Sequence, residues 1–166
     1  WTGGKGAIWR ELDRLAKTYA KNPLARACRG RFLLEDRECP PERAFEDLDF
    51  AVEALPRDPW CRAWRAQAYE RLGKNSEALK DFNECIRLKP QWAWAWAWRG
   101  KFRLARGNAR GALADFNKSL RLNPISGEVY AWRAQAAKAG PSGDARRDFT
   151  RAVALGYKEK ILELAR

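Results

Sequence analysis

A period of 34 residues runs through most of this chain and restricts its fold more than any other feature of the sequence. The segment 78–83, Ala-Leu-Lys-Asp-Phe-Asn, returns at 112–117 as Ala-Leu-Ala-Asp-Phe-Asn. A Trp-Arg pair stands at 64–65, 98–99 and 132–133, again at intervals of 34 residues. Self-similarity at such a period indicates units that cannot bury their apolar sides alone and therefore stack on their neighbours. We therefore predict a repeat architecture.

The pattern extends in both directions from these copies. Backwards, Asp47 and Pro56 each lie 34 residues before their counterparts in the next copy. Forwards, Asp148 and Phe149 lie 33 residues beyond theirs, so one residue is missing from the turn at 140–143. The sequence therefore contains four copies in phase.

Within each copy, small residues, glycines and prolines recur where they favour a pair of helices. Small residues at the positions of Gly100 and Ala112 allow two helices to approach closely, and Phe116 fills the space beside them. Gly73 stands where the first helix of its copy would end, and Pro90 follows the end of the second. Each copy is therefore predicted to form two helices of about four turns.

The tryptophan-rich run at 90–100, Pro-Gln-Trp-Ala-Trp-Ala-Trp-Ala-Trp-Arg-Gly, obeys two periodicities. Alternation by two is typical of a strand, but alanine favours helices and the proline stands where a helix can start. At about 100° per residue, a helix places Trp92 and Trp96 on one side and Trp94 and Trp98 on nearly the opposite side. The 34-residue pattern favours the helix.

The pattern resembles the tetratricopeptide repeat, a helix-turn-helix unit of 34 residues with characteristic Trp, Gly, Ala, Phe and Pro positions. Trp96, Gly100, Ala112, Phe116 and Pro124 match those positions in one copy. The resemblance covers residues 24–157 and implies an all-α, right-handed superhelical solenoid of four helix pairs. In three copies arginine replaces the Leu of the pattern, at positions 65, 99 and 133.

The two ends of the chain depart from the regular repeat. We assign 1–23 to an N-terminal helix, because apolar residues recur at helical spacing over 7–21. This helix is either a cap or the second helix of a truncated repeat. Residues 158–166 are predicted to form a short C-terminal capping helix, since the open end of a stack must be covered. The inter-helix turn at 34–41 is two residues longer than its equivalent in the next copy.

The sequence carries little that could support catalysis. Histidine, the commonest general base and a common metal ligand, is absent. Aspartates recur once per copy at 47, 81, 115 and 148, which indicates a role in the geometry of each repeat rather than in one active site. We therefore predict a non-enzymatic protein that needs no cofactor and no metal ion.

The four cysteines lack the paired short spacings of a zinc site. Cys61 and Cys85 would lie at similar height on the two helices of one repeat. They could form a disulfide, or Cys85 could be a buried small residue and Cys61 a thiol. We favour the second alternative.

The resemblance implies that the first helix of each repeat lines a concave groove. Trp96 is then expected to pack inside, while Trp94 and Trp98 project into the groove. Contiguous exposed aromatic side chains usually mark a binding site, although tight curvature could let these tryptophans cover one another as core. The candidate site residues are Trp60, Trp64, Gln67, Arg71, Trp94, Trp98, Lys101, Trp132, Gln135 and Lys138.

The expected partner follows from the aromatic and basic character of this groove. The formal net charge is +12, from 33 basic and 21 acidic residues, and residues 93–126 are the most basic segment. We expect a protein or peptide with apolar anchors and acidic flanks. Some family members bind acidic chaperone tails with groove asparagines, but Trp64, Trp98 and Trp132 occupy that column here, so a different ligand is expected.

Two alternatives remain open at this stage. Residues 7–21 of a second copy could enter the groove and give a homo-oligomer. A nucleic acid or another polyanion could bind the basic segment, with phosphates on the arginines and lysines and bases on the tryptophans. The basic residues concerned are Arg99, Lys101, Arg103, Arg106, Arg110, Lys118 and Arg121.

The sequence says little about where the protein resides. Its longest apolar run, 92–98, is too short to span a bilayer, so no membrane span is expected. The chain starts at Trp1 and contains no methionine, which we interpret as a segment of a longer or processed protein. No compartment can be assigned from these features, and a cytoplasmic location is the working expectation.

Overall fold

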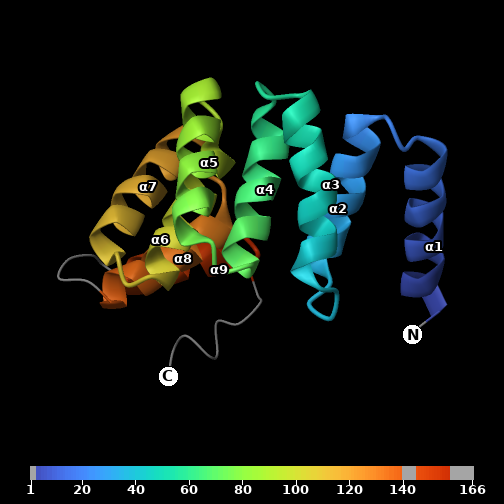
Figure 1. Cartoon of the computed structure of the whole chain (residues 1–166). Helices are drawn as coiled ribbons and strands as arrows, with labels where there is room; N and C mark the ends of the chain where they lie inside the picture. Colours follow the sequence, from blue (N-terminus) through green and yellow to red (C-terminus); the bar gives the residue numbers. More distant parts are fainter. Residues whose placement is uncertain (1–2, 140–144, 158–166) are drawn as a thin grey trace. The chain divides into compact units, whose positions relative to one another are not determined.

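The computed structural model describes residues 3–139 and 145–157, and every regular element within these ranges is an α-helix (Figure 1). This confirms the predicted all-α fold, including the helical interpretation of the tryptophan-rich run. The expected capping helix at 158–166 lies outside the described residues. The division of the chain into 1–23, 24–157 and 158–166 stays a prediction.

The chain divides into two compact units, each described here by itself. Unit 1 is Trp1–Leu88 and unit 2 is Lys89–Arg166. The helices of unit 1 are α1 (Gly3–Thr18), α2 (Pro23–Glu35), α3 (Pro41–Ala54), α4 (Pro59–Arg71) and α5 (Asn75–Leu88). Those of unit 2 are α6 (Ala93–Ala105), α7 (Ala109–Leu122), α8 (Gly127–Ala139) and α9 (Ala145–Ala154).

The helices pack as the predicted pairs. In unit 1, α2 packs against α3 and α4 against α5, while α3 also contacts α4. In unit 2, α6 packs against α7 and α8 against α9, while α7 also contacts α8. Each unit therefore stacks two helix-turn-helix repeats.

Glycines and side-chain caps define the helix ends. Gly73 and Gly107 adopt φ angles of 72° and 76°, a region that glycine enters without steric cost, directly after α4 and α6. The side chains of Asp58 and Asn108 accept hydrogen bonds from backbone N–H groups in the first turns of α4 and α7. Local sequence thus marks the starts of α4 and α7 and the ends of α4 and α6.

The core of each repeat forms where two helices approach closely. Phe82 and Phe116 are completely buried, each on the second helix of its pair. A Cβ atom on Gly100 would lie 2.7 Å from Cε1 of Phe116, so even a methyl group at this crossing would require the Phe116 ring to shift. The close approach of Phe116 explains why the repeat pattern has a small residue at position 100.

The N-terminal helix starts earlier and ends earlier than the apolar spacing over 7–21 suggested. It ends at Thr18 because the chain turns at Tyr19, whose carbonyl oxygen accepts a hydrogen bond from the Asn22 N–H at 2.8 Å. The side chain of Asn22 then caps α2. Asp13 on α1 contacts Arg29 on α2 at 3.4 Å.

Candidate functional site

A buried aspartate on the second helix of each repeat binds arginines from the first helix. In the α4–α5 pair, Asp81 is 4% exposed. Its two carboxylate oxygens accept hydrogen bonds from Nε and Nη2 of Arg65 at 2.7 and 2.9 Å, and one also accepts from Nη1 of Arg62 at 3.1 Å. A bidentate guanidinium–carboxylate pair of this kind is both strong and directional.

The same Arg–Asp pair recurs in the other three helix pairs. It links α2 to α3, α6 to α7 and α8 to α9 through hydrogen bonds of 2.5 to 3.0 Å within each fork. The pairs are Arg29–Asp47, Arg99–Asp115 and Arg133–Asp148, and Arg103 adds a further bond to Asp115. The recurring aspartates therefore hold each repeat together, as their spacing indicated.

Three of these arginines also reach back to the preceding helix. Arg65 binds Asp49 on α3 at 2.8 Å, and Arg133 binds Asn117 on α7 at 2.7 Å. Arg29 reaches Asp13 in the same way. The arginine thus joins successive repeats as well as the helices within one repeat. Its hydrogen bonds to Asp148 raise the pKa of Arg133 further above its ordinary value, although partial burial opposes the rise.

Both halves of this ion pair were visible in the sequence. The aspartates recur with the repeat, and arginine replaces the Leu of the pattern at 65, 99 and 133. Their partnership was missed because the two positions lie 15 or 16 residues apart on different helices in these copies. A search for opposite charges that recur together with the repeat would have found it.

Three of the predicted site residues form a continuous aromatic surface in unit 2. The ring centroids of Trp94 and Trp98 on α6 lie 5.9 Å apart, and Trp94 lies 6.3 Å from Trp132 on α8 in an edge-to-face arrangement. The Nζ of Lys101 lies 5.0 Å from the centre of the Trp132 ring. We call Trp94, Trp98, Lys101 and Trp132 the tryptophan face.

Burial differs among the members of the tryptophan face. Trp132 is 7% exposed and also packs against Phe116. Trp94 and Trp98 are partly exposed, and Lys101 is exposed. The face therefore has a buried base, a partly accessible aromatic layer and a cation at its edge. It combines the two roles considered from the sequence, core and surface.

The prediction that Trp96 packs inside is wrong. Trp96 is partly exposed, its Nε1 donates a hydrogen bond to the Pro90 carbonyl oxygen at 2.9 Å, and the Arg99 guanidinium lies 5.0 Å from its ring. Trp92 is the buried residue instead, with its ring edge-to-face to Trp98 at 5.3 Å. Helical angles do not apply to Trp92, because it is the N-cap and lies outside the helix.

The candidate residues of unit 1 form a smaller aromatic group. The rings of Trp60 and Trp64 lie 6.0 Å apart on α4, and Trp60 is 41% exposed. The guanidinium of Arg31 lies 5.7 Å from the Trp64 ring. Gln67 is partly exposed, and its side-chain amide donates to the Ala63 carbonyl oxygen at 3.4 Å.

Arg71, another predicted site residue, binds the backbone of its own unit. Its guanidinium donates hydrogen bonds to the carbonyl oxygens of Leu33, Leu34 and Asp36 at 3.1 to 3.3 Å, and to that of Cys39 at 2.7 Å. These carbonyls belong to the end of α2 and the long turn that follows it. Arg71 therefore supplies hydrogen bonds to backbone carbonyl oxygens at the end of α2 and in the longer α2–α3 turn.

Gln135 and Lys138 occupy the last helix of the predicted groove. Gln135 is partly exposed, whereas Lys138 is exposed and its Nζ lies 5.3 Å from the Phe149 ring. Lys138 thus contacts α9 within the same repeat.

The structure leaves fewer basic groups for a polyanion than the sequence suggested. Arg99 and Arg103 bind Asp115, and the Nζ of Lys118 lies 6.0 Å from the Trp96 ring. A surface that binds a polyanion needs basic groups that face solvent together. The self-association hypothesis, which involves residues 7–21, stays a prediction.

Cys61 and Cys85 are both completely buried thiols. The Sγ of Cys85 lies 3.3 Å from the Pro59 carbonyl oxygen, to which it donates a hydrogen bond. Burial and the nearby Asp58 carboxylate raise the pKa of Cys61 to about 12. This agrees with the alternative favoured from the sequence. Among residues 3–139 and 145–157, no three His, Cys, Asp or Glu side chains lie close enough to hold a metal ion.

Comparisons with known proteins agree with this architecture. A sequence model described as a tetratricopeptide repeat matches residues 59–102. No curated protein matches the chain in sequence. No helix in the described part of the chain has both the length and the apolar character needed to cross a membrane.

Solved structures are similar over 72% to 99% of the chain. A TPR protein of Thermus thermophilus has a TM-score of 0.83 at 20% identity, over 99% of this chain and 89% of its own. MamA has a TM-score of 0.72 at 18% identity, over 95% and 92%. The first TPR of Spaghetti (RPAP3), bound to an HSP90 peptide, has a TM-score of 0.64 at 24% identity, over 72% and 93%. The repeat matched at 59–102, the stacked helix pairs and these similar structures show that the chain has the tetratricopeptide repeat fold.

Proposed function

We propose that this protein is a non-enzymatic scaffold that binds a peptide segment of a partner protein on the tryptophan face of unit 2. The observation that carries the proposal is the contact of Trp94 with both Trp98 and Trp132, beside the Lys101 ammonium group. These rings come from two successive first helices, α6 and α8, which contact each other. Tryptophan is among the residues that most often dominate binding energy at protein interfaces.

Partial exposure makes these rings suitable anchors. Trp94 and Trp98 already rest on the buried Trp132 and Trp92 rings, so they lose little side-chain freedom when a ligand covers them. Their remaining exposed area is apolar and gains free energy when it leaves water. The partner should therefore present an apolar side chain to this surface.

Charge indicates what should flank that apolar side chain. Residues 89–166 include sixteen basic and six acidic residues, so unit 2 carries most of the excess positive charge of the chain. Lys101 is exposed at the edge of the tryptophan face. A positive surface increases the association rate of an acidic partner and disfavours a basic one. We therefore propose a peptide with an apolar anchor and acidic flanks.

The peptide complex among the similar structures supports the class of ligand. The peptide bound by the Spaghetti repeat, SRMEEVD, contains two glutamates and an aspartate. The present chain has tryptophan at positions 64, 98 and 132, so its preferred peptide should depend more on an apolar anchor. The acidic flanks are the feature we carry over to this proposal.

The test measures peptide affinity by fluorescence anisotropy. The probe is a fluorescein-labelled peptide with one central leucine between pairs of glutamates. We expect Trp98→Ala to weaken its binding by about 30-fold, which corresponds to an interface anchor worth about 2 kcal/mol.

Trp96→Ala is the matched control, because Trp96 lies on the same helix but contacts Pro90 and Arg99 instead of the tryptophan face. It should change the affinity less than twofold, a change well below that of an interface anchor. Circular dichroism must show that both variants remain folded. Equal losses for the two variants, or a peptide with lysine flanks that binds better, would refute the proposal.

A further inference from the structure

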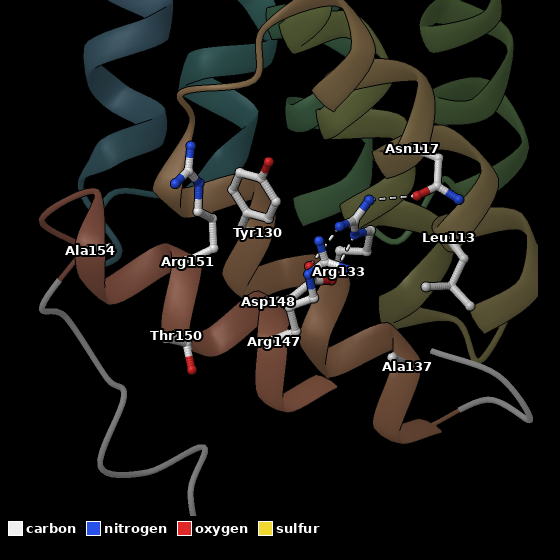
Figure 2. A pocket seen from close by; sticks show the side chains of 10 residues that line it. All are labelled: Leu113, Asn117, Tyr130, Arg133, Ala137, Arg147, Asp148, Thr150, Arg151 and Ala154. Carbon is white, nitrogen blue, oxygen red and sulfur yellow. Dashed lines mark hydrogen bonds and ion pairs between the residues drawn. The ribbon is translucent and has the colours of Figure 1, made fainter. Parts of the chain in front are cut away.

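A pocket of about 980 Å³ lies in unit 2 between α7, α8 and α9 (Figure 2). Its lining residues differ from those of the tryptophan face, so it is a second and separate feature of the unit. The side chains that carry the argument are Leu113, Tyr130, Arg133, Ala137, Arg147 and Arg151. Ligand pockets in proteins commonly have volumes of about 300 to 1,000 Å³.

The pocket lies where unit 1 has two aromatic rings and unit 2 has smaller side chains. Leu113 and Ala137 stand 68 residues, or two repeats, after Phe45 and Tyr69 of unit 1. In unit 1 the rings of Phe45 and Tyr69 contact each other at 4.9 Å and fill the equivalent space. The smaller side chains of unit 2 leave this space open.

The arginine–aspartate framework recurs in both repeats, although Tyr130 of unit 2 stands where unit 1 has Arg62. Arg65 binds Asp81 and Asp49 in unit 1, and Arg133 binds Asp148 and Asn117 in unit 2. The Arg65 guanidinium lies 5.5 Å from the Tyr69 ring. An aromatic ring that entered the space beside Ala137 would therefore lie near a guanidinium already held in place, as the Tyr69 ring does.

The wall of the pocket is positively charged. Asp148 accepts hydrogen bonds on both of its oxygens from Arg133 at 2.6 Å, so its charge is compensated. Arg147 and Arg151 are exposed, line the pocket and lie four residues apart on α9. Arg151 therefore offers a positive charge to an anionic group at the mouth of the pocket.

We propose that this pocket binds an aromatic side chain of a partner polypeptide, with the carboxylates of its neighbouring residues held by Arg147 and Arg151. The ring would take the place that Tyr69 occupies in unit 1. The Thr150 hydroxyl and the Tyr130 ring, which also line the pocket, complete a polar and aromatic rim. A peptide with a tyrosine or phenylalanine between acidic residues has this chemistry.

The test fills the pocket with the side chain that unit 1 already uses there. The probe is a fluorescein-labelled peptide with one tyrosine between pairs of aspartates, and binding is followed by anisotropy. Ala137→Tyr should weaken binding by at least about tenfold, because the new ring competes for the same space. The matched control is Ala114→Tyr, at an exposed position of α7, which should change the affinity less than twofold. Ala137→Tyr should fold, because Tyr69 is accommodated by the same framework in unit 1.

Further variants separate charge from shape. Arg151→Gln should weaken binding by at least about threefold at low salt and by less at high salt, since exposed charges are screened. Trp96→Ala, at a residue outside both the pocket and the tryptophan face, should leave binding of this probe unchanged. Free 4-hydroxyphenylacetate should compete only at concentrations far above those of the peptide.

The possible results divide clearly. Loss of binding with Ala137→Tyr but not with Ala114→Tyr or Trp96→Ala supports the proposal. The proposal is overturned if the peptide does not bind at millimolar concentration, or if replacing its tyrosine with alanine has no effect. Equal affinity for the peptide and for 4-hydroxyphenylacetate would overturn the assignment of a polypeptide ligand.

Discussion

Replacing Asp81 with asparagine should destabilise the protein strongly, because it removes the charge at the centre of a buried ion pair. Asp81 is 4% exposed and accepts three hydrogen bonds from Arg62 and Arg65. In Asp81→Asn one of the two oxygens becomes an NH2 group, which donates and therefore faces a guanidinium unfavourably. Arg65 then loses the bidentate pair, and its one remaining carboxylate partner is Asp49 at 2.8 Å.

The expected loss is about 3 kcal/mol, the lower end of the range for breaking a buried pair. We choose the lower end because Arg65 keeps one carboxylate partner. For a chain of this length, that loss corresponds to a decrease in melting temperature of about 6 to 12 °C. Thermal unfolding followed by circular dichroism at 222 nm measures it.

Glu84→Gln is a matched control on the same helix, three residues away. Glu84 forms a similar two-bond contact with Arg87, at 2.7 Å for both bonds, but this pair is solvent-exposed. The hydrogen bonds from Arg87 lower the pKa of Glu84, yet water and salt screen such exposed pairs. We expect almost no change in melting temperature. If Asp81→Asn costs no more than Glu84→Gln, burial does not determine the strength of the repeat-wide pairs and the reasoning is wrong.

Three further predictions follow from single residues. Because the pKa of Cys61 is raised to about 12, iodoacetamide at pH 8 should label the exposed Cys28 and spare Cys61, and equal labelling rates would contradict this. The free energy of unfolding should also fall as the pH rises from about 9 towards 12, because in this range only the unfolded chain releases the Cys61 proton. Arg71→Leu should cost about 2 kcal/mol and increase amide hydrogen exchange over residues 33–40, whose carbonyls it binds, and unchanged exchange would refute that role. Gly100→Ala should lower stability by about 1 to 3 kcal/mol in chemical denaturation, because its Cβ would lie 2.7 Å from Phe116, and a neutral effect would show that the crossing relaxes easily.

The repeat architecture could be predicted because its requirements are local. The residue at the position of Gly100 must be small because two helices cross there, and Gly73 adopts a positive φ just after α4 ends. These requirements recur with every copy, so they appear in the sequence as a period. The helix pairs and their ends could therefore be predicted from the sequence alone.

The contacts of individual side chains were harder to predict because they depend on the backbone and side chains that surround each residue in the folded chain. Trp96 was expected to be internal, but Trp92 lies at the N-cap with φ −85° and ψ 101° and takes the buried place against Trp98. Arg71 was assigned to the groove, whereas its guanidinium binds backbone carbonyls of the α2–α3 turn. Helical periodicity gives the direction of a side chain but not the acceptor that it will meet.

The most direct test of the account is to observe the tryptophan side chains themselves during peptide binding. The chain has nine tryptophans, each with an indole N–H that gives a separate signal in a 1H–15N correlation spectrum of labelled protein. Single Trp→Phe variants assign the signals of Trp94, Trp96 and Trp98. Titration with the acidic leucine peptide should shift the Trp94 and Trp98 signals and leave that of Trp96, whose N–H is held by Pro90, unchanged. A shift of Trp96 without shifts of Trp94 and Trp98 would contradict the proposed binding face.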